Sequence, residues 1–186
     1  MKKIFIALMA MISVAAYAQP KFAHVNSTEL IQLMPEADAA RSQMAATQKE
    51  AQTTFEEMYT EYTTKAQQYQ QNVNTWTQTV RELKEKELTQ IQQSLEEFNQ
   101  SIQQELQQKQ QELMAPIQQK VNETIQKLAK EGGYVFVFDV STLLYVDDAQ
   151  STDLTPAART ILGIPEGRTL ESLYAELQAQ QQAAQQ

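Results

Sequence analysis

The sequence predicts an α+β fold in which a long helical hairpin projects from a small β body. The first observation is the stretch from Glu36 to Ala115, which contains no glycine or proline and lies between Pro35 and Pro116. Glutamine, glutamate, alanine, leucine and lysine dominate this stretch, and most of these residues are good helix formers. The second observation is that short runs of aromatic and β-branched residues, typical of strands, lie before and after it.

Apolar residues in the second half of the long stretch have the spacing of a coiled coil. Steps of three and four residues form a narrow stripe, which Lys109 interrupts. The stripe consists of Leu88, Ile91, Leu95, Phe98, Ile102, Leu106, Leu113, Ile117, Val121, Ile125 and Leu128. Because the strand-like segments lie at both ends, we expect an antiparallel coiled-coil arm over residues 37–130. We place its tip near residues 72–82, where helix propensity falls.

Residues 1–18 have the pattern of a secretory signal peptide. Lys2 and Lys3 precede an apolar run, and Ala16–Ala18 is a small-x-small motif, so we expect cleavage between Ala18 and Gln19. The apolar run is too short to span a bilayer comfortably. Without the two lysines the net charge changes from −8 to −10, which argues against nucleic acid and anionic membrane surfaces as partners.

Residues 19–36 supply the first part of the expected body. Lys21–Asn26 is a strand candidate with alternating side chains. Asn26 and Glu29 form a pair like a capping box, which opens a short helix. Pro35 ends or kinks that helix before the arm begins.

Residues 131–177 supply the remaining strands and helices of the body. Gly133 follows the arm and favours a helix end, and residues 134–139 form the clearest strand of the sequence. We expect residues 143–146 to be the partner strand of 134–139.

Two short helices are expected in the last part of the chain. One begins at Thr155, has proline in its first turn and ends at Gly163, and Thr169 caps the other. Residues 178–186 contain only glutamine and alanine, and we expect them to be a frayed tail.

The body is small for an independent domain. Outside the signal and the arm about 65 residues remain, a size at which a lone domain is marginally stable, and its strands have open edges. Strands from several copies closing into one barrel would solve both problems. This argument does not specify the number of copies.

The polar residues of the body do not form a recognisable catalytic or metal site. His24 is the only histidine and the chain has no cysteine, so we expect a structural role for it. A hard-cation site is conceivable at the acidic residues, but their spacing lacks a glycine-containing loop, and turn or cap roles are favoured. These residues are Asp139, Asp147, Asp148 and Asp153. We therefore predict no enzymatic activity, no cofactor and no metal.

The order of these pieces resembles the Skp/OmpH family of periplasmic chaperones over roughly residues 20–162. The matching pieces are Ala23-His24-Val25-Asn26, Pro116-Ile117, Gly133-Tyr134-Val135-Phe136-Val137-Phe138-Asp139, Leu144-Tyr145 and Asp153-Leu154-Thr155. The sequence departs from the best-known members in its acidic charge and in the extra residues 163–186.

The resemblance implies a homotrimer in the periplasm whose helical arms enclose a cavity. That cavity would hold unfolded outer-membrane β-barrel proteins without ATP. The strands of three subunits would form a trimeric barrel, and the residues expected to build it are Phe22, Val25, Tyr134, Val135, Phe136, Val137, Phe138, Leu144 and Tyr145.

Aromatic and methionine side chains on the first half of the arm are candidates for contact with such clients. They are Met44, Phe55, Met58, Tyr59, Tyr62, Tyr69 and Trp76. Soft, amphipathic side chains make adaptable contacts, but packing against the returning helix is the favoured role for most of these residues. Tyr59 lies off the apolar seam, which favours contact with a client, and Trp76 suits either role.

The alternative function is a non-catalytic structural spacer or adaptor in the periplasm. A spacer is expected to have a continuous, leucine-rich seam. The aromatic residues and interruptions of the seam favour the chaperone.

Overall fold

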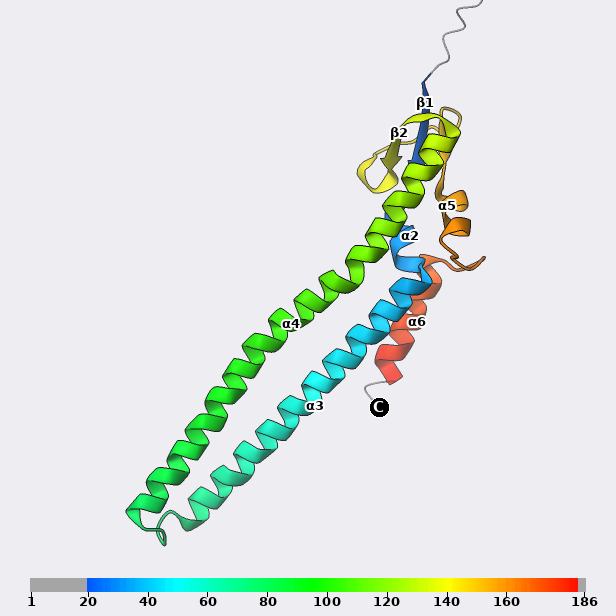
Figure 1. Ribbon diagram of the computed structural model, residues 1–186. Helices are drawn as coiled ribbons and strands as arrows, with labels where there is room; N and C mark the ends of the chain where they lie inside the picture. Colours follow the sequence, from blue (N-terminus) through cyan, green and yellow to red (C-terminus); the bar gives the residue numbers. More distant parts are fainter. Residues whose placement is uncertain (1–19, 184–186) are drawn as a thin grey trace, which may run out of the picture.

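The computed structural model describes residues 20–183, in which two long helices project from a small body containing a sheet (Figure 1). The elements in chain order are β1 (Lys21–Val25), α2 (Ser27–Leu33), α3 (Pro35–Asn72), α4 (Gln78–Gly132), β2 (Tyr134–Asp139), the 3-10 helix η2 (Val140–Thr142), β3 (Ser151–Asp153), α5 (Thr155–Ile161) and α6 (Leu170–Ala183). The predicted combination of long helices and a small sheet is confirmed. The expected signal peptide, with its cleavage site at Ala18 and Gln19, lies outside the described residues.

The sheet has the strand order β2-β1-β3, and both outer strands run parallel to β1. In this register His24 lies between Phe138 on one side and Asp153 on the other. The expectation that residues 143–146 form the partner strand of β2 is wrong, because those residues have no strand conformation. Asp139 caps η2 directly after β2, and the chain then crosses to the far edge of β1, as a parallel strand requires.

Helices α3 and α4 lie side by side, and residues 73–77 join them at the end far from the body (Figure 1). Lys120 forms an ion pair with Glu36 near the body, and the Tyr69 hydroxyl donates a hydrogen bond to Glu85 near the turn. Helix α4 continues through Pro116 and ends before Gly133, whose φ of 67° requires the left-handed region that glycine tolerates.

Local capping signals of the body are confirmed. The Asn26 side chain accepts a hydrogen bond from the Glu29 backbone N–H at 3.0 Å, which opens α2. Thr169 accepts from the Ser172 N–H at 3.1 Å and opens α6. The expected frayed tail at residues 178–186 is wrong for 178–183, which belong to α6. Alanine and glutamine extend a helix readily once its first turns are anchored by packing.

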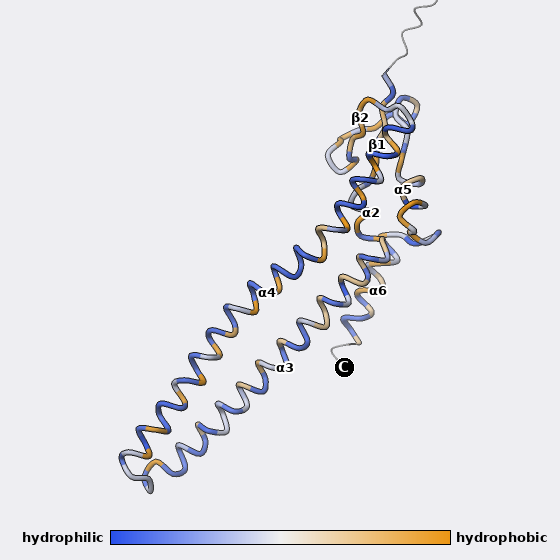
Figure 2. Tube along the Cα trace, in the orientation of Figure 1, coloured by the Kyte–Doolittle hydropathy of each residue, from blue (hydrophilic) through white to orange (hydrophobic). Residues whose placement is uncertain are grey.

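The hydrophobic core of the chain lies where the arm joins the body, and five helices contribute to it. Its buried residues are Val25, Leu30, Leu33, Met34, Ala37, Ala40, Ile117, Val121, Ala158, Leu162, Ile164 and Leu173. The buried residues of α3 are Ala37 and Ala40, and the buried residues of α4 are Ile117, Val121 and Thr124. All of them lie near the body, so the arm has no buried side chain farther out among the described residues. Figure 2 shows apolar positions recurring singly along α4 and a paler, more mixed α3.

Within residues 20–183, none of the helices is both long and apolar enough to cross a membrane.

Candidate binding surfaces of the arm and the body

Six of the seven candidate client-contact residues are half-buried along the arm. They are Met44, Phe55, Met58, Tyr62, Tyr69 and Trp76. Phe55 lines a cavity of about 230 Å³ together with Phe98 and Leu106 of α4. The two helices are therefore not close-packed at this height, unlike a protein interior.

Tyr59 is the most exposed member of the set, with 53% of its surface accessible. Its ring stacks on that of Phe55, with centroids 6.3 Å apart and planes 10° from parallel. The stacked pair thus extends from the cavity between the two helices to the exposed surface of α3.

The far end of the arm carries a second aromatic pair. The rings of Tyr69 and Trp76 meet edge to face, with centroids 6.0 Å apart. The Glu85 carboxylate accepts the hydrogen bond of the Tyr69 hydroxyl and raises the pKa of that hydroxyl. Trp76 thus packs against Tyr69 of the same chain while remaining only half-buried.

Charged side chains of the arm are paired across the two helices. Lys65 of α3 lies 3.6 Å from Glu87 of α4, and Lys84 donates to the same carboxylate at 2.9 Å. The hydrogen bond from Lys84 is the main cause that lowers the pKa of Glu87, and the positive charge of Lys65 also lowers it. The hydrogen bond from Lys120 lowers the pKa of Glu36 in the same way. Because ion pairs that remain accessible to water are worth little, these pairs add little to the stability of the arm.

The sheet presents an exposed aromatic face. Phe136 and Phe138 of β2 are 58% and 42% exposed, and Phe22 of β1 stacks on Phe136 with centroids 6.3 Å apart. Leu144 and Tyr145 are also exposed, so the loop after η2 extends the apolar surface. β2 is an edge strand, whose free backbone groups can pair with another chain.

The residues predicted for the trimer body do not all lie on this face. Val25 is buried in the hydrophobic core of the chain, and Val137 packs against that core. The Tyr134 ring lies against Gly132, where an added Cβ would come within 2.1 Å of it. Phe22, Val135, Phe136, Phe138, Leu144 and Tyr145 are the half-buried or exposed remainder.

His24 is a buried strand residue bonded to its neighbours. Its Nδ1 lies 2.9 Å from Ser151 Oγ, and its Nε2 lies 3.9 Å from Asp148 and 4.0 Å from Asp153. Asp153 accepts a hydrogen bond from the Thr155 N–H, and Asp147 accepts one from the Ala149 N–H. With Asp139, which caps η2, three of the four acidic residues thus have turn or cap roles.

Asp139 joins the end of β2 to the start of α2. Burial acts to raise the pKa of its carboxyl, but hydrogen bonds donated by Ser27 and Ser141 together outweigh burial and lower it. A lowered folded-state pKa means that the carboxylate stabilises the fold above the unfolded-state value near 3.8. This contribution is lost as the pH falls through the folded-state value.

Asp139→Asn is therefore expected to lower the free energy of unfolding at pH 7 by about 1–2 kcal/mol, because hydrogen bonds to a charged group are weakened. The difference from the parent protein should vanish in strong acid, where Asp139 itself is protonated. Urea unfolding followed by circular dichroism at both pH values measures this. Asp147→Asn, at an exposed turn, is the control, and an equal loss there would contradict the special role of Asp139.

The charged network at the root of the arm had no signal in the sequence. Arg168 donates to both oxygens of Asp38 at 2.6 Å, and Arg159 pairs with Glu29. Each pair joins residues 130 positions apart, so neither could be found from local spacing.

Comparisons with known proteins agree with this architecture. The family described as "Outer membrane protein (OmpH-like)" matches residues 21–162. A crystal structure from Caulobacter crescentus CB15, described as a candidate outer membrane chaperone (OmpH-like), is similar with a TM-score of 0.69. The identity is 16%, and the match covers 78% of this chain and 85% of that chain, so the likeness concerns the fold alone. No curated protein matches the sequence.

Proposed function

This chain belongs to the OmpH-like family, and on that basis we propose that it is a periplasmic holdase chaperone. It acts as a homotrimer that binds unfolded outer-membrane β-barrel proteins between its arms and prevents their aggregation. The mechanism is sequestration by many weak contacts, without ATP and without catalysis.

The observation that carries this proposal is the construction of the arm. Helices of 38 and 55 residues project from the body, and α3 alone extends about 57 Å at about 1.5 Å per residue. Beyond the root, the arm offers half-buried aromatic and methionine side chains among glutamines. Such a surface can adapt to many unfolded sequences.

The exposed aromatic face of the sheet supports self-association. Phe136, Phe138 and Tyr145 would be buried if the β2 edges of three copies met. The arms of the three subunits would then leave the barrel together and surround a common cavity.

Release follows from the client's own chemistry in this mechanism. A β-barrel that inserts into the outer membrane buries its apolar surface in lipid and pairs its strands completely. The many weak contacts with the arms are then lost without any nucleotide. Thermodynamic competition with client folding is enough to empty the cavity.

The test is to dilute a porin from urea into the mature protein and measure the mass by light scattering after gel filtration. We expect one peak of three subunits plus one client. The same porin already folded in detergent is the control and should not bind. Precipitation of the porin beside an unchanged protein peak would refute the holdase and favour the spacer.

Trp76 provides a second readout in the same mixture, provided that the porin used has its tryptophans replaced. Client contact near the tip should shift the emission of Trp76, the only tryptophan of this chain. Complex formation with an unchanged emission would remove Trp76 from the client surface while keeping the holdase.

A further inference from the structure

The chain continues beyond the family match, and this extra segment is built into the root of the arm. Residues after 162 lie outside the match, yet Ile164 and Leu173 are buried in the core, and Leu170 and Leu177 pack against it. The first two turns of α6 thus pack against the hydrophobic core of the chain.

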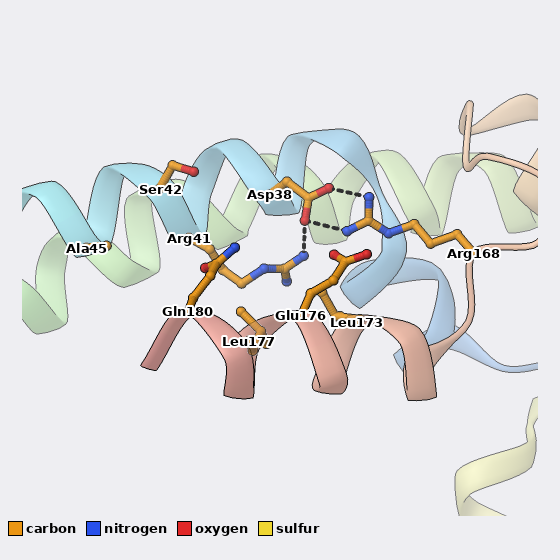
Figure 3. A pocket seen from close by; sticks show the side chains of 9 residues that line it. All are labelled: Asp38, Arg41, Ser42, Ala45, Arg168, Leu173, Glu176, Leu177 and Gln180. Atoms are coloured by element: carbon orange, nitrogen blue, oxygen red, sulfur yellow. Dashed lines mark hydrogen bonds and ion pairs between the residues drawn. The ribbon is translucent and has the colours of Figure 1, made fainter. Parts of the chain in front are cut away.

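The extra segment touches the arm where α3 leaves the body. Arg168 binds both carboxylate oxygens of Asp38 at 2.6 Å, and Arg41 pairs with the same carboxylate. Figure 3 shows Asp38 between the two guanidinium groups, with Leu173 and Leu177 on the α6 side of the cleft. The cleft holds about 590 Å³, so contact is made by these anchors and not by continuous close packing.

The same segment is also tied to the body. Arg159 of α5 donates to the carbonyl oxygens of Arg168 at 2.6 Å and of Pro165 at 3.2 Å. Tyr174 of α6 donates to the Gln32 side chain of α2 at 3.0 Å. The segment therefore connects α2, α5 and the first turns of α3.

Each arm helix contains a proline at this height. Pro35 begins α3 directly after the break that follows α2, and Pro116 lies inside α4 opposite that start, lining one cavity with Met34 and Glu36. A proline inside a helix removes one backbone hydrogen bond and favours a kink. Without a third support, both helices could change direction here.

We propose that residues 163–183 are a strap that sets the direction of the arm by holding the start of α3 onto α2 and α5. α3 is enclosed at its root, with Ala37 and Ala40 facing α4 and with Asp38 and Arg41 facing α6. Past the reach of α6, only two helices remain. The strap therefore fixes the direction of the arm at its root.

The Arg168 anchor affects direction more than stability. Its Nε is buried and has no hydrogen-bond partner among the described residues. Leaving that donor unpaired offsets part of what the bidentate pair with Asp38 contributes. The planar fork still fixes the relative orientation of the two segments, so its removal should loosen the arm without unfolding the chain.

The test measures arm direction directly and needs no client, so failure of the holdase proposal would leave it intact. The chain has no cysteine, so spin labels can be placed at Thr75→Cys in the far turn and Ala157→Cys on α5. Labelled chains are diluted with unlabelled ones, so that pulsed electron resonance reads the distance within one subunit.

In R168Q/L177A, made in the full chain, we expect the distance distribution to broaden about twofold, because the arm root opens locally. E171Q, on the exposed side of the first turn of α6, is the matched control and should leave the width unchanged. If R168Q/L177A is folded and its distance distribution is as narrow as that of the parent protein, the strap proposal is wrong. If the double variant loses helical signal in circular dichroism, the single variant R168Q is measured instead, because it leaves the apolar core intact. An unbroadened distance distribution in R168Q would also show that the strap proposal is wrong.

Discussion

Replacing Phe136 and Phe138 with aspartate is expected to break the proposed trimer into single chains. Both rings are exposed on the β2 edge, so a trimer that closes there would have to bury six carboxylates without partners. Burying unpaired carboxylates carries a large desolvation cost, which the aromatic side chains around them cannot offset. The mass by light scattering should fall about threefold if the assembly is a closed trimer.

The same variant should keep its secondary structure. The two rings contact Phe22 and each other, and neither belongs to the buried core. Tyr59→Asp, an equally exposed aromatic on the arm, is the matched control and should leave the mass unchanged. A double aspartate variant with the parent's mass would show that the copies meet elsewhere.

Leu30→Ala is expected to lower the free energy of unfolding by about 3 kcal/mol, the middle of the range for a buried leucine. Leu30 is fully buried in α2, in the cluster that also contains Val121, Ala158 and Leu173. The cavity would therefore lie where arm, body and extra C-terminal segment meet.

Urea unfolding at one fixed protein concentration measures this effect, because association contributes to the apparent stability. Leu83→Ala on the arm, where Leu83 is 56% exposed, should change stability by less than about 0.5 kcal/mol. A loss below about 1 kcal/mol for Leu30→Ala would mean that α2 is not the hub of the core.

Features with a local cause were predictable from the sequence. Helix formation follows from composition over tens of residues, and the caps at Asn26, Thr169 and Gly133 follow from single side chains or from their absence. The family resemblance relied on the same local pieces. The aromatic strand β2 was found because its side chains favour strands in almost any sheet.

Features that join distant residues were decided only by the tertiary structure. Residues 143–146 have strand propensity, yet β3 lies at Ser151–Asp153 beside the other edge of β1. Residues 178–183 are helical because Leu173 and Leu177 anchor the turns before them. The Arg168–Asp38 pair depends on two segments 130 residues apart meeting at one place. Local propensity cannot rank such arrangements, because their energies come from contacts that exist only after the chain has packed.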